Sequence, residues 1–297
     1  MRVNPNYTAQ IVDLLNSTQQ AQSDALQQLS SGRRISKPSD GPAAEAAMTA
    51  ENSRSAAAVQ FTANSESLKQ VLNTADSTLS SVVTILQRAS TLGVEAANGT
   101  LNQSDLAAIA DEISGIKSQM LSLANTSYAG QYIFGGTVTA NPPYAINATD
   151  STQIDYNGNT QQNQVQIGSG LSVAANLPGS SIFSQSGASV FTALQSMISA
   201  IQAGNAPSIS AAGIQLSTAL DAVNTSRVFY GNTVNELTSN ESYLSQEKIN
   251  IASYQNTLVS SDTATAITAV TQAEYARNAT VAAAAKMNQV SLLDYLK

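Results

Sequence analysis

The chain has 297 residues and a formal net charge of −7, with 13 basic and 20 acidic side chains. This balance argues against a nucleic-acid-binding protein, whose binding surface is basic. Cysteine and histidine are both absent, which excludes disulfides, thiolate zinc sites and catalysis by either side chain. No apolar run is long enough to predict a transmembrane helix. The N-terminus lacks the apolar core of a secretory signal peptide.

The N-terminal part predicts a helix followed by a sharp break. Residues 6–31 carry a thin apolar stripe, and Gly32 can end this helix. The segment from residue 33 to 42 contains two prolines, each of which restricts the residue before it, so this passage is predicted to be non-helical. Pro42 suits the first turn of a new helix.

A second helix is predicted from about residue 43 to 97. Its second half keeps a strict heptad of apolar or small residues, which indicates coiled-coil-like packing. The heptad positions are Leu68, Leu72, Ala75, Leu79, Val82, Leu86, Ala89, Gly93 and Ala96. Asn98-Gly99 marks a turn, and Ser104 is predicted to cap a third helix that ends near Tyr128. The short connection implies that the second and third helices are antiparallel neighbours.

Residues 130–137 form the densest aromatic spot in the chain and are flanked by glycines. They do not follow a strand and open a helix with the spacing of a phosphate-binding loop, so no nucleotide site is predicted. We expect a β-turn element whose aromatic side chains pack against a helical layer.

Residues 141–185 alternate apolar and polar residues with a period of two, which is typical of strands. One run ends at Tyr156, and the next begins near Val165. Asn157-Gly158 lies between the two runs and is predicted to be a hairpin turn. The segment is therefore expected to form a small antiparallel β domain.

The helical pattern resumes at residues 190–201, is interrupted by Gly204 and Pro207, and then continues to the end of the chain. From residue 232 onward there is neither glycine nor proline, the residues that most often break a helix. The apolar spacing stays regular as far as Leu258. We interpret residues 260–263 as a hinge or a new helix cap, beyond which the chain is alanine-rich and weakly striped.

The segments follow the order helical, β, helical, and such an insertion requires its two flanks to lie close together. We predict a mainly α fold: a long antiparallel coiled-coil-like helical bundle built from both chain halves, with a small inserted antiparallel β domain. Three domains are expected. Residues 1–42 plus 260–297 form a terminal coiled-coil assembly domain, residues 43–140 plus 186–259 form a helical bundle domain, and residues 141–185 form the β domain.

The outermost segments are expected to pair with each other and to serve as an assembly interface. At about 25 cal/mol per Å2, their small side chains would not offset backbone ordering of roughly 1–2 kcal/mol per residue. We therefore expect both ends to be disordered in the free monomer and to fold when neighbouring copies pack around them. The candidate interface residues are Tyr7, Ile11, Leu14, Leu15, Leu26, Leu29, Ile267, Val270, Val281, Leu292, Leu293, Tyr295 and Leu296.

Four stretches, in order along almost the whole chain, resemble the flagellin family and, within it, the proteins that join the flagellar hook to the filament. They are Leu29–Ile35 with Pro38–Asp40, Gln131–Thr137, the β segment between Tyr156 and Phe183, and Ser291–Leu296. The resemblance implies a structural, non-enzymatic subunit of the bacterial flagellum. It also implies an extracellular location, with export through the flagellar secretion channel and no cleaved signal peptide.

The same resemblance implies an arrangement and a set of partners. The subunit would self-associate into a ring between the first hook-associated protein and the flagellin filament. Its termini would pair as an inner layer, and the β domain would project outward. A cytoplasmic export chaperone would bind the C-terminal helix. No cofactor, metal, nucleic acid or membrane insertion is expected, and filament flagellin itself stays open as the alternative function.

Two other classes of function fit the residues less well. An enzyme would need two carboxylates that face one pocket, but Asp111 and Glu112 are adjacent on a helix and point in different directions. These two, like Asp105 and Asp155, are more simply explained as parts of a solvated face. A recognition module would need an aromatic-lined or charged site, and residues 138–185 show neither.

Overall fold

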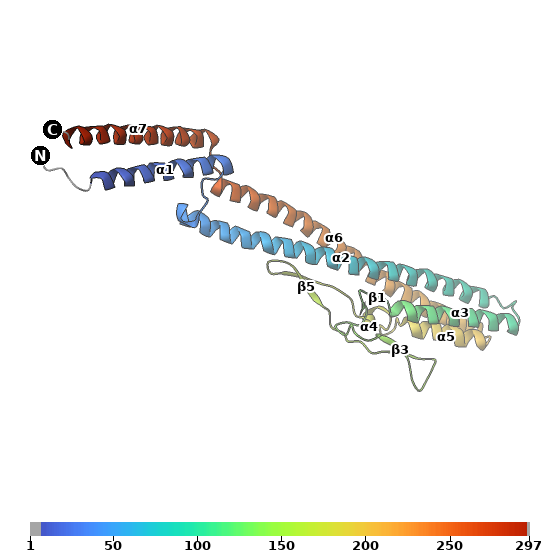
Figure 1. Cartoon of the computed structure of the whole chain (residues 1–297). Coiled ribbons are helices and arrows are strands. Elements are labelled where there is room, and N and C mark those ends of the chain that lie inside the picture. Colours follow the sequence, from blue (N-terminus) through green and yellow to red (C-terminus); the bar gives the residue numbers. More distant parts are fainter. Residues whose placement is uncertain (1–6, 296–297) are drawn as a thin grey trace. The chain divides into compact units, whose positions relative to one another are not determined.

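The computed structural model describes the backbone of residues 7–295 and the side-chain surroundings of residues 9–286. The chain forms two compact units (Figure 1). The middle unit comprises residues 58–246. The terminal unit comprises residues 1–57 and 247–297.

The described chain is mainly helical, as predicted. The helices are α1 (Tyr7–Ser31), α2 (Pro42–Ala96), α3 (Gln103–Ala124), α4 (Gly179–Ile182), α5 (Val190–Gln202), α6 (Ala206–Val259) and α7 (Thr263–Tyr295), with a 3-10 turn, η1 (Pro38–Asp40), between α1 and α2. The break at residues 260–263 is confirmed, because α6 ends just before it and Asp262 accepts a hydrogen bond from the Ala264 N–H at 3.2 Å. Pro207 lies inside the first turn of α6, where its missing N–H removes no helical hydrogen bond.

The third helix differs from its prediction at both ends. Asn102, rather than Ser104, caps α3: its side-chain oxygen accepts from the Asp105 N–H at 3.0 Å, and the Asp105 carboxylate accepts from the Asn102 N–H at 3.2 Å. This reciprocal pair is a capping box, so the helix starts earlier than predicted. The helix also ends at Ala124, and Tyr128 lies in a strand instead.

Among residues 7–295, six short strands form three separate antiparallel hairpins. They are β1 (Ser127–Tyr128) with β2 (Gln131–Tyr132), β3 (Tyr144–Ile146) with β4 (Ile154–Tyr156), and β5 (Gln164–Gly168) with β6 (Leu171–Ala174). The prediction that Asn157-Gly158 forms a hairpin turn is wrong. The strand that precedes it, β4, pairs with the earlier strand β3 and not with a strand after the turn. Tyr144 and Tyr156 therefore face each other across the β3–β4 ladder, with ring centroids 5.1 Å apart.

The core of the middle unit follows the seam between α2 and α6. The predicted heptad from Leu68 to Ala96 is buried at every position, which confirms the coiled-coil-like packing. Gly93 completes this stripe because Met197 of α5 occupies the space that a Cβ would need. Helices α3 and α5 pack on each other beside this seam (Figure 1). The matching residues of α6 are at most 1% exposed: Leu216, Val223, Tyr230 and Leu237.

Several aromatic side chains of the middle unit gather in a cluster beside α5. Phe134 packs edge-on against Phe183 with ring centroids 5.3 Å apart. Tyr144 packs against Phe183 at 5.7 Å and against Phe191 of α5 at 5.2 Å. Such pairs contribute about 0.5–1.5 kcal/mol beyond their buried area. From the segment 130–137, Phe134 is fully buried in this cluster against Phe183, the residue that directly follows α4.

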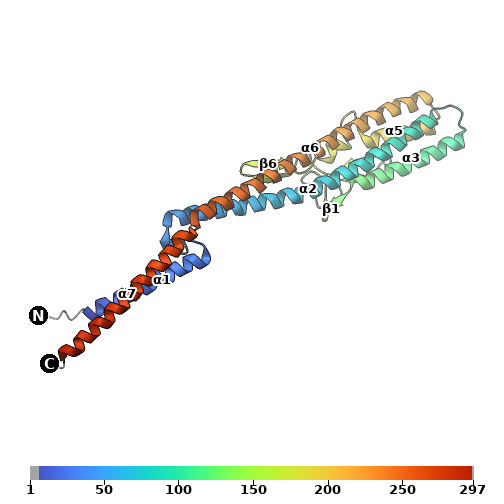
Figure 2. The same cartoon turned by 90° about the horizontal axis from the view of Figure 1, so that it is seen from above.

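In the terminal unit, α1 and α7 lie side by side and run antiparallel (Figures 1 and 2). The connections at their shared end hydrogen-bond to each other. The Arg34 N–H donates to the Val259 carbonyl at 2.7 Å, and the Ser261 N–H donates to the Gly32 carbonyl at 2.8 Å. Gly32 adopts a left-handed conformation, with φ +66°, that favours glycine. We call these connections, residues 32–41 and 260–262, the double corner.

Ile35 and Asp40 hold the longer connection of the double corner, residues 32–41, in place. The Ile35 side chain is buried, with 4% of its surface exposed. The Asp40 carboxylate accepts from the Ser36 N–H at 3.1 Å and from the Lys37 N–H at 2.9 Å. These backbone hydrogen bonds hold the pKa of Asp40 below its ordinary value. The double corner is therefore built by polar contacts around one buried aliphatic side chain.

Candidate assembly interface

Helices α1 and α7 meet along a seam of mostly small or polar side chains. On α1, apart from the half-buried Asp24 and Gln28, the buried or half-buried positions alternate steps of four and three, as in a coiled coil. They are Ile11, Leu15, Thr18, Gln22, Ala25 and Leu29. The corresponding positions on α7 are Ala266, Val270, Ala273, Thr280 and Ala284. Because alanine and threonine carry little apolar area, this seam stabilises the pair weakly per residue.

Besides Leu14, four aliphatic side chains on the described parts of these two helices stay about half exposed. On α1 they are Val12, at 54%, and Leu26, at 45%. On α7 they are Ile267, at 53%, and Val281, at 48%. Each follows a seam position by one residue. The seam residues that precede them are Ile11, Ala25, Ala266 and Thr280.

Helical geometry places these four side chains on one face of the pair. A step of one residue turns about 100° around a helix axis, and on two antiparallel helices that turn leads to the same side. The isolated bridge between Arg33 and Ser260 sets the register. Leu26 and Ile267 are each seven residues from this bridge, so they lie at about the same level. We call this face, formed by Val12, Leu26, Ile267 and Val281, the apolar ledge.

The structure divides the predicted interface residues into three groups. Half-buried in the seam are Ile11, Leu15, Leu29 and Val270. Exposed are Leu14, Leu26, Ile267 and Val281, of which Leu14 lies on the other side of the α1 seam. The side chains of Tyr7, Leu292, Leu293 and Tyr295, and the whole of Leu296, lie outside the described part of the chain.

The sequence interpretation missed Val12 and the polar members of the seam. Thr18 and Gln22 continue the alternation of four and three residues that starts at Ile11. Searching for that spacing, rather than for apolar residues alone, would have found them. With the seam assigned, Val12 stands out as an apolar residue one step off it.

The net charge of the protein lies entirely in one unit. Residues 58–246 contain eleven acidic and four basic side chains, which gives −7, whereas the terminal unit has nine of each and sums to zero. Copies of the terminal unit can therefore pack together without net electrostatic repulsion.

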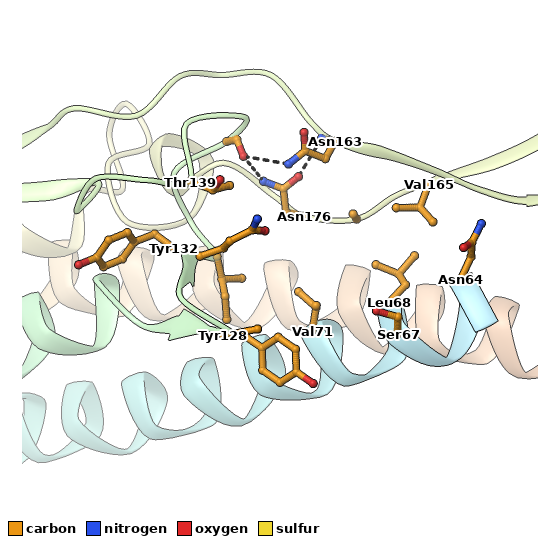
Figure 3. A pocket seen from close by; sticks show the side chains of 15 residues that line it. Asn64, Ser67, Leu68, Val71, Tyr128, Tyr132, Thr139, Asn163, Val165 and Asn176 are labelled. Carbon is orange, nitrogen blue, oxygen red and sulfur yellow. Dashed lines mark hydrogen bonds between the residues drawn. The ribbon is translucent and has the colours of Figure 1, made fainter. Parts of the chain in front are cut away.

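A cleft of about 420 Å3 lies in the middle unit beside α2 (Figure 3). Leu68 and Val71 of α2 form an aliphatic floor. Above them, the Asn163 and Asn176 amides both donate to the Gly136 carbonyl, at 3.4 and 2.9 Å. None of the residues that line the cleft is charged. Its tyrosines, Tyr128 and Tyr132, come from the β1–β2 hairpin and not from residues 138–185. The cleft therefore offers a neutral surface without an acid, a base or a metal ligand.

The carboxylates considered for catalysis have separate structural surroundings. Asp105 belongs to the α3 cap, Glu112 pairs with Arg88 at 2.7 Å, and Asp155 accepts from the Asn147 amide at 2.8 Å. Asp111 is exposed on α3. Within the described residues, no group of three or more acidic side chains could hold a metal ion. No helix in the described part of the chain is long and apolar enough to cross a membrane.

Comparison with known sequences points to one family. The model of the bacterial flagellin N-terminal helical region matches residues 3–139. Flagellar hook-associated protein 3 of Escherichia coli is 29% identical over 295 residues, covering 91% of this chain and 92% of that protein. A flagellin of Listeria monocytogenes is 30% identical over 128 residues, covering 43% of this chain and 45% of that protein.

A solved structure agrees with the sequence comparisons. The crystal structure of Bacillus cereus FlgL superimposes with a TM-score of 0.60 and 26% identity, covering 70% of this chain and 99% of that one. Flagellin-family proteins are structural, so the carboxylates above have no catalytic reaction to serve. The N-terminal family match, the near full-length sequence relative and the shared fold show that this chain belongs to the flagellin family, as a structural component of the flagellum.

Proposed function

We propose that this protein forms the junction between hook and filament of a bacterial flagellum, outside the cell, and self-associates there through its terminal helices. The observation that carries this proposal is the apolar ledge. It presents four half-exposed aliphatic side chains on one face of the α1–α7 pair. The near full-length similarity to a hook-associated protein 3 supports the junction as the location.

The energetics favour a neighbouring copy as the cover for this face. Full burial of an aliphatic side chain stabilises by about 1.5–3 kcal/mol, so covering the exposed half of each ledge residue contributes about 1 kcal/mol. One ledge against a different face of the next copy is a heterologous contact, which generates rings or helical arrays. The zero net charge of the terminal unit removes the main electrostatic obstacle to such packing.

The proposed division of labour follows the three segments inferred from the sequence. Residues 1–42 plus 260–297 are the assembly domain, residues 43–140 plus 186–259 are the helical bundle domain, and residues 141–185 are the outward-projecting β domain. The assembly interface includes the eight described candidates and extends to the five outside the described side chains. These five are Tyr7, Leu292, Leu293, Tyr295 and Leu296.

The chain assembles with flagellar components, and we propose three specific partners besides other copies of itself. The first hook-associated protein lies on one side of the ring and flagellin on the other. A cytoplasmic export chaperone binds the C-terminal helix before export through the flagellar channel. Binding of the chaperone to α7 would cover Ile267 and Val281, and so would keep the ledge from self-associating inside the cell.

Filament flagellin is the alternative function, and the extent of the similarity weighs against it. The flagellin relative described above aligns with less than half of this chain, whereas the hook-associated relative aligns with nearly all of it. Electron microscopy of labelled protein on flagella separates the two. A single band between hook and filament supports the junction, and label along the whole filament would establish flagellin.

The ledge itself can be tested with matched valine substitutions. Val12→Gln together with Val281→Gln should abolish the joining of hook to filament, because the amide side chains would lose the apolar contact and place polar groups in it. Val59→Gln is the control, because Val59 is equally exposed, at 55%, but lies outside the assembly domain. Normal joining by the double variant would contradict a role for the ledge.

The proposed ordering of the termini on assembly has its own measurement. Amides of residues 9–30 and 264–286 should exchange rapidly in the monomer and become protected in the assembled state. Truncation of residues 282–297 should prevent this protection while leaving the middle unit protected. Strong protection of both ends in the monomer would show that neighbours are not needed to fold them.

A further inference from the structure

The dipeptide Asn-Gly occurs twice in this chain, at residues 98–99 and 157–158. Both asparagines are exposed. Sequence alone gives the two dipeptides the same chemistry, because in each the residue after asparagine lacks a Cβ. The structure places them in two different backbone environments.

Asn98-Gly99 lies in the open connection between α2 and α3. The Asn98 N–H donates to the Glu95 carbonyl at 3.2 Å, in the last turn of α2. Gly99 has φ +63°, and no heavy atom beyond Gly99 and its two chain neighbours lies within 4 Å of the position that a Cβ would take. Across the described residues, no backbone carbonyl accepts the Gly99 N–H. The Gly99 nitrogen is therefore both accessible and free to change its position relative to the Asn98 side chain.

Asn157-Gly158 is held on both sides. The Asn157 N–H donates to the Pro143 carbonyl at 2.8 Å, and the Asn159 N–H donates to the Gly135 carbonyl at 3.2 Å. A Cβ on Gly158 would lie 2.5 Å from the Tyr156 ring and 2.7 Å from the Gly135 oxygen. Rotation of this backbone would break one or both hydrogen bonds, and the Tyr156 ring and the Gly135 oxygen leave it little room to move.

We propose that Asn98 is a site of spontaneous deamidation in the folded protein and that the fold protects Asn157 from the same reaction. The Gly99 nitrogen loses its proton to water or hydroxide and attacks the Asn98 side-chain carbonyl carbon. A C–N bond forms, the bond to the side-chain nitrogen breaks, and ammonia leaves after taking a proton from solvent. Water then opens the cyclic imide, which yields aspartate or, by attack at the other carbonyl, isoaspartate.

The modification would change the end of α2. Either product adds a negative charge two residues beyond Ala96, the last residue of the helix, where the helix dipole disfavours anions. Glu95 is already close in sequence, and the middle unit already carries a net charge of −7. Isoaspartate also lengthens the main chain by one carbon. An extracellular structural protein would accumulate this change with age.

The test is peptide mapping by mass spectrometry after incubation of the full-length protein at neutral and mildly alkaline pH. Asn98 should gain the mass of an amide-to-acid conversion at least about tenfold faster than Asn157, and faster at the higher pH. A tenfold ratio corresponds to about 1.4 kcal/mol, a barrier comparable to opening one backbone hydrogen bond at Asn157 or Asn159. In urea-unfolded protein the two rates should become similar.

A substitution at Asn98 tests whether the mass change arises from ring closure at this asparagine. Asn98→Gln should remove the fast conversion, because glutamine would have to close a larger ring, and it should leave Asn157 unchanged. Equal rates at Asn98 and Asn157 in the folded protein would overturn the proposal. So would a lack of conversion at Asn98 over a period in which the unfolded chain converts.

Discussion

The two units of this protein use the same helical geometry with opposite side-chain content. In the middle unit, the α2 seam contains Leu72, Leu79 and Leu86, and none of them is exposed to solvent. In the terminal unit, the α1–α7 seam mixes Ala25, Ala266 and other small or polar side chains with a few half-buried aliphatic ones such as Leu15. The middle unit therefore buries the large apolar residues of its seam within one chain. The terminal unit leaves Val12, Leu26, Ile267 and Val281 about half exposed, and we propose that a neighbouring copy covers them.

A substitution in the aromatic cluster should destabilise one unit far more than the other, and this is the largest difference that we expect. Phe183→Ala should destabilise the middle unit by about 3–5 kcal/mol, because Phe183 is fully buried and contacts Phe134 and Tyr144. Hydrogen exchange should show faster opening of residues 134–200. The terminal helices should be unaffected.

Leu26→Ala is the matched substitution in the terminal unit. It should change the stability of the monomer by no more than about 1 kcal/mol, because Leu26 is nearly half exposed. It should nevertheless weaken assembly. If Leu26→Ala destabilised the monomer as much as Phe183→Ala, the contrast between the units would be wrong.

A change in ionic strength should also affect the opening free energies of the two units differently, but by a smaller amount than the substitutions above. Repulsion within the middle unit, with a net charge of −7, is screened by added salt, whereas the terminal unit has no net charge to screen. Moving from low to high sodium chloride should raise the opening free energy of the middle unit by roughly 1 kcal/mol, measured by hydrogen exchange. The terminal unit should change less.

Two exposed glutamates provide the control for this charge effect. Glu66→Gln and Glu236→Gln remove two acidic charges from the middle unit at positions where both side chains are exposed. The salt dependence of the middle unit should fall in this double variant. An unchanged dependence would mean that local ion pairs such as Asp76–Arg227 and Lys69–Glu241, rather than net charge, determine it.

The contrast between the units also explains which features could be predicted from the sequence. The heptad from Leu68 to Ala96 was readable because large apolar residues recur at a fixed spacing. The α1–α7 seam was only partly readable, since Thr18 and Gln22 occupy positions that an apolar pattern leaves blank. The wrong hairpin at Asn157-Gly158 has a different cause. Local turn preference favoured that dipeptide, but non-local pairing across the β3–β4 ladder decided the register.

Protonation of Asp40 in the double corner should give the smallest change in stability, and this change should be confined to the terminal unit. Asp40 has a lower pKa in the folded protein than its ordinary value of 3.8, because the Ser36 and Lys37 N–H groups donate to its ionised carboxylate. The stabilisation that ionised Asp40 contributes is therefore fully present above about pH 4. It is lost as the pH falls through the lower pKa that Asp40 has in the folded protein. The protection of the Ser36 and Lys37 amides, relative to their intrinsic exchange rates, should fall over that acid range. In Asp40→Asn the exchange should be faster at neutral pH and should lose this acid dependence, since no proton is taken up. Identical acid profiles in the two proteins would show that the double corner is held by Ile35 and the hydrogen bonds to residues 259–261 alone.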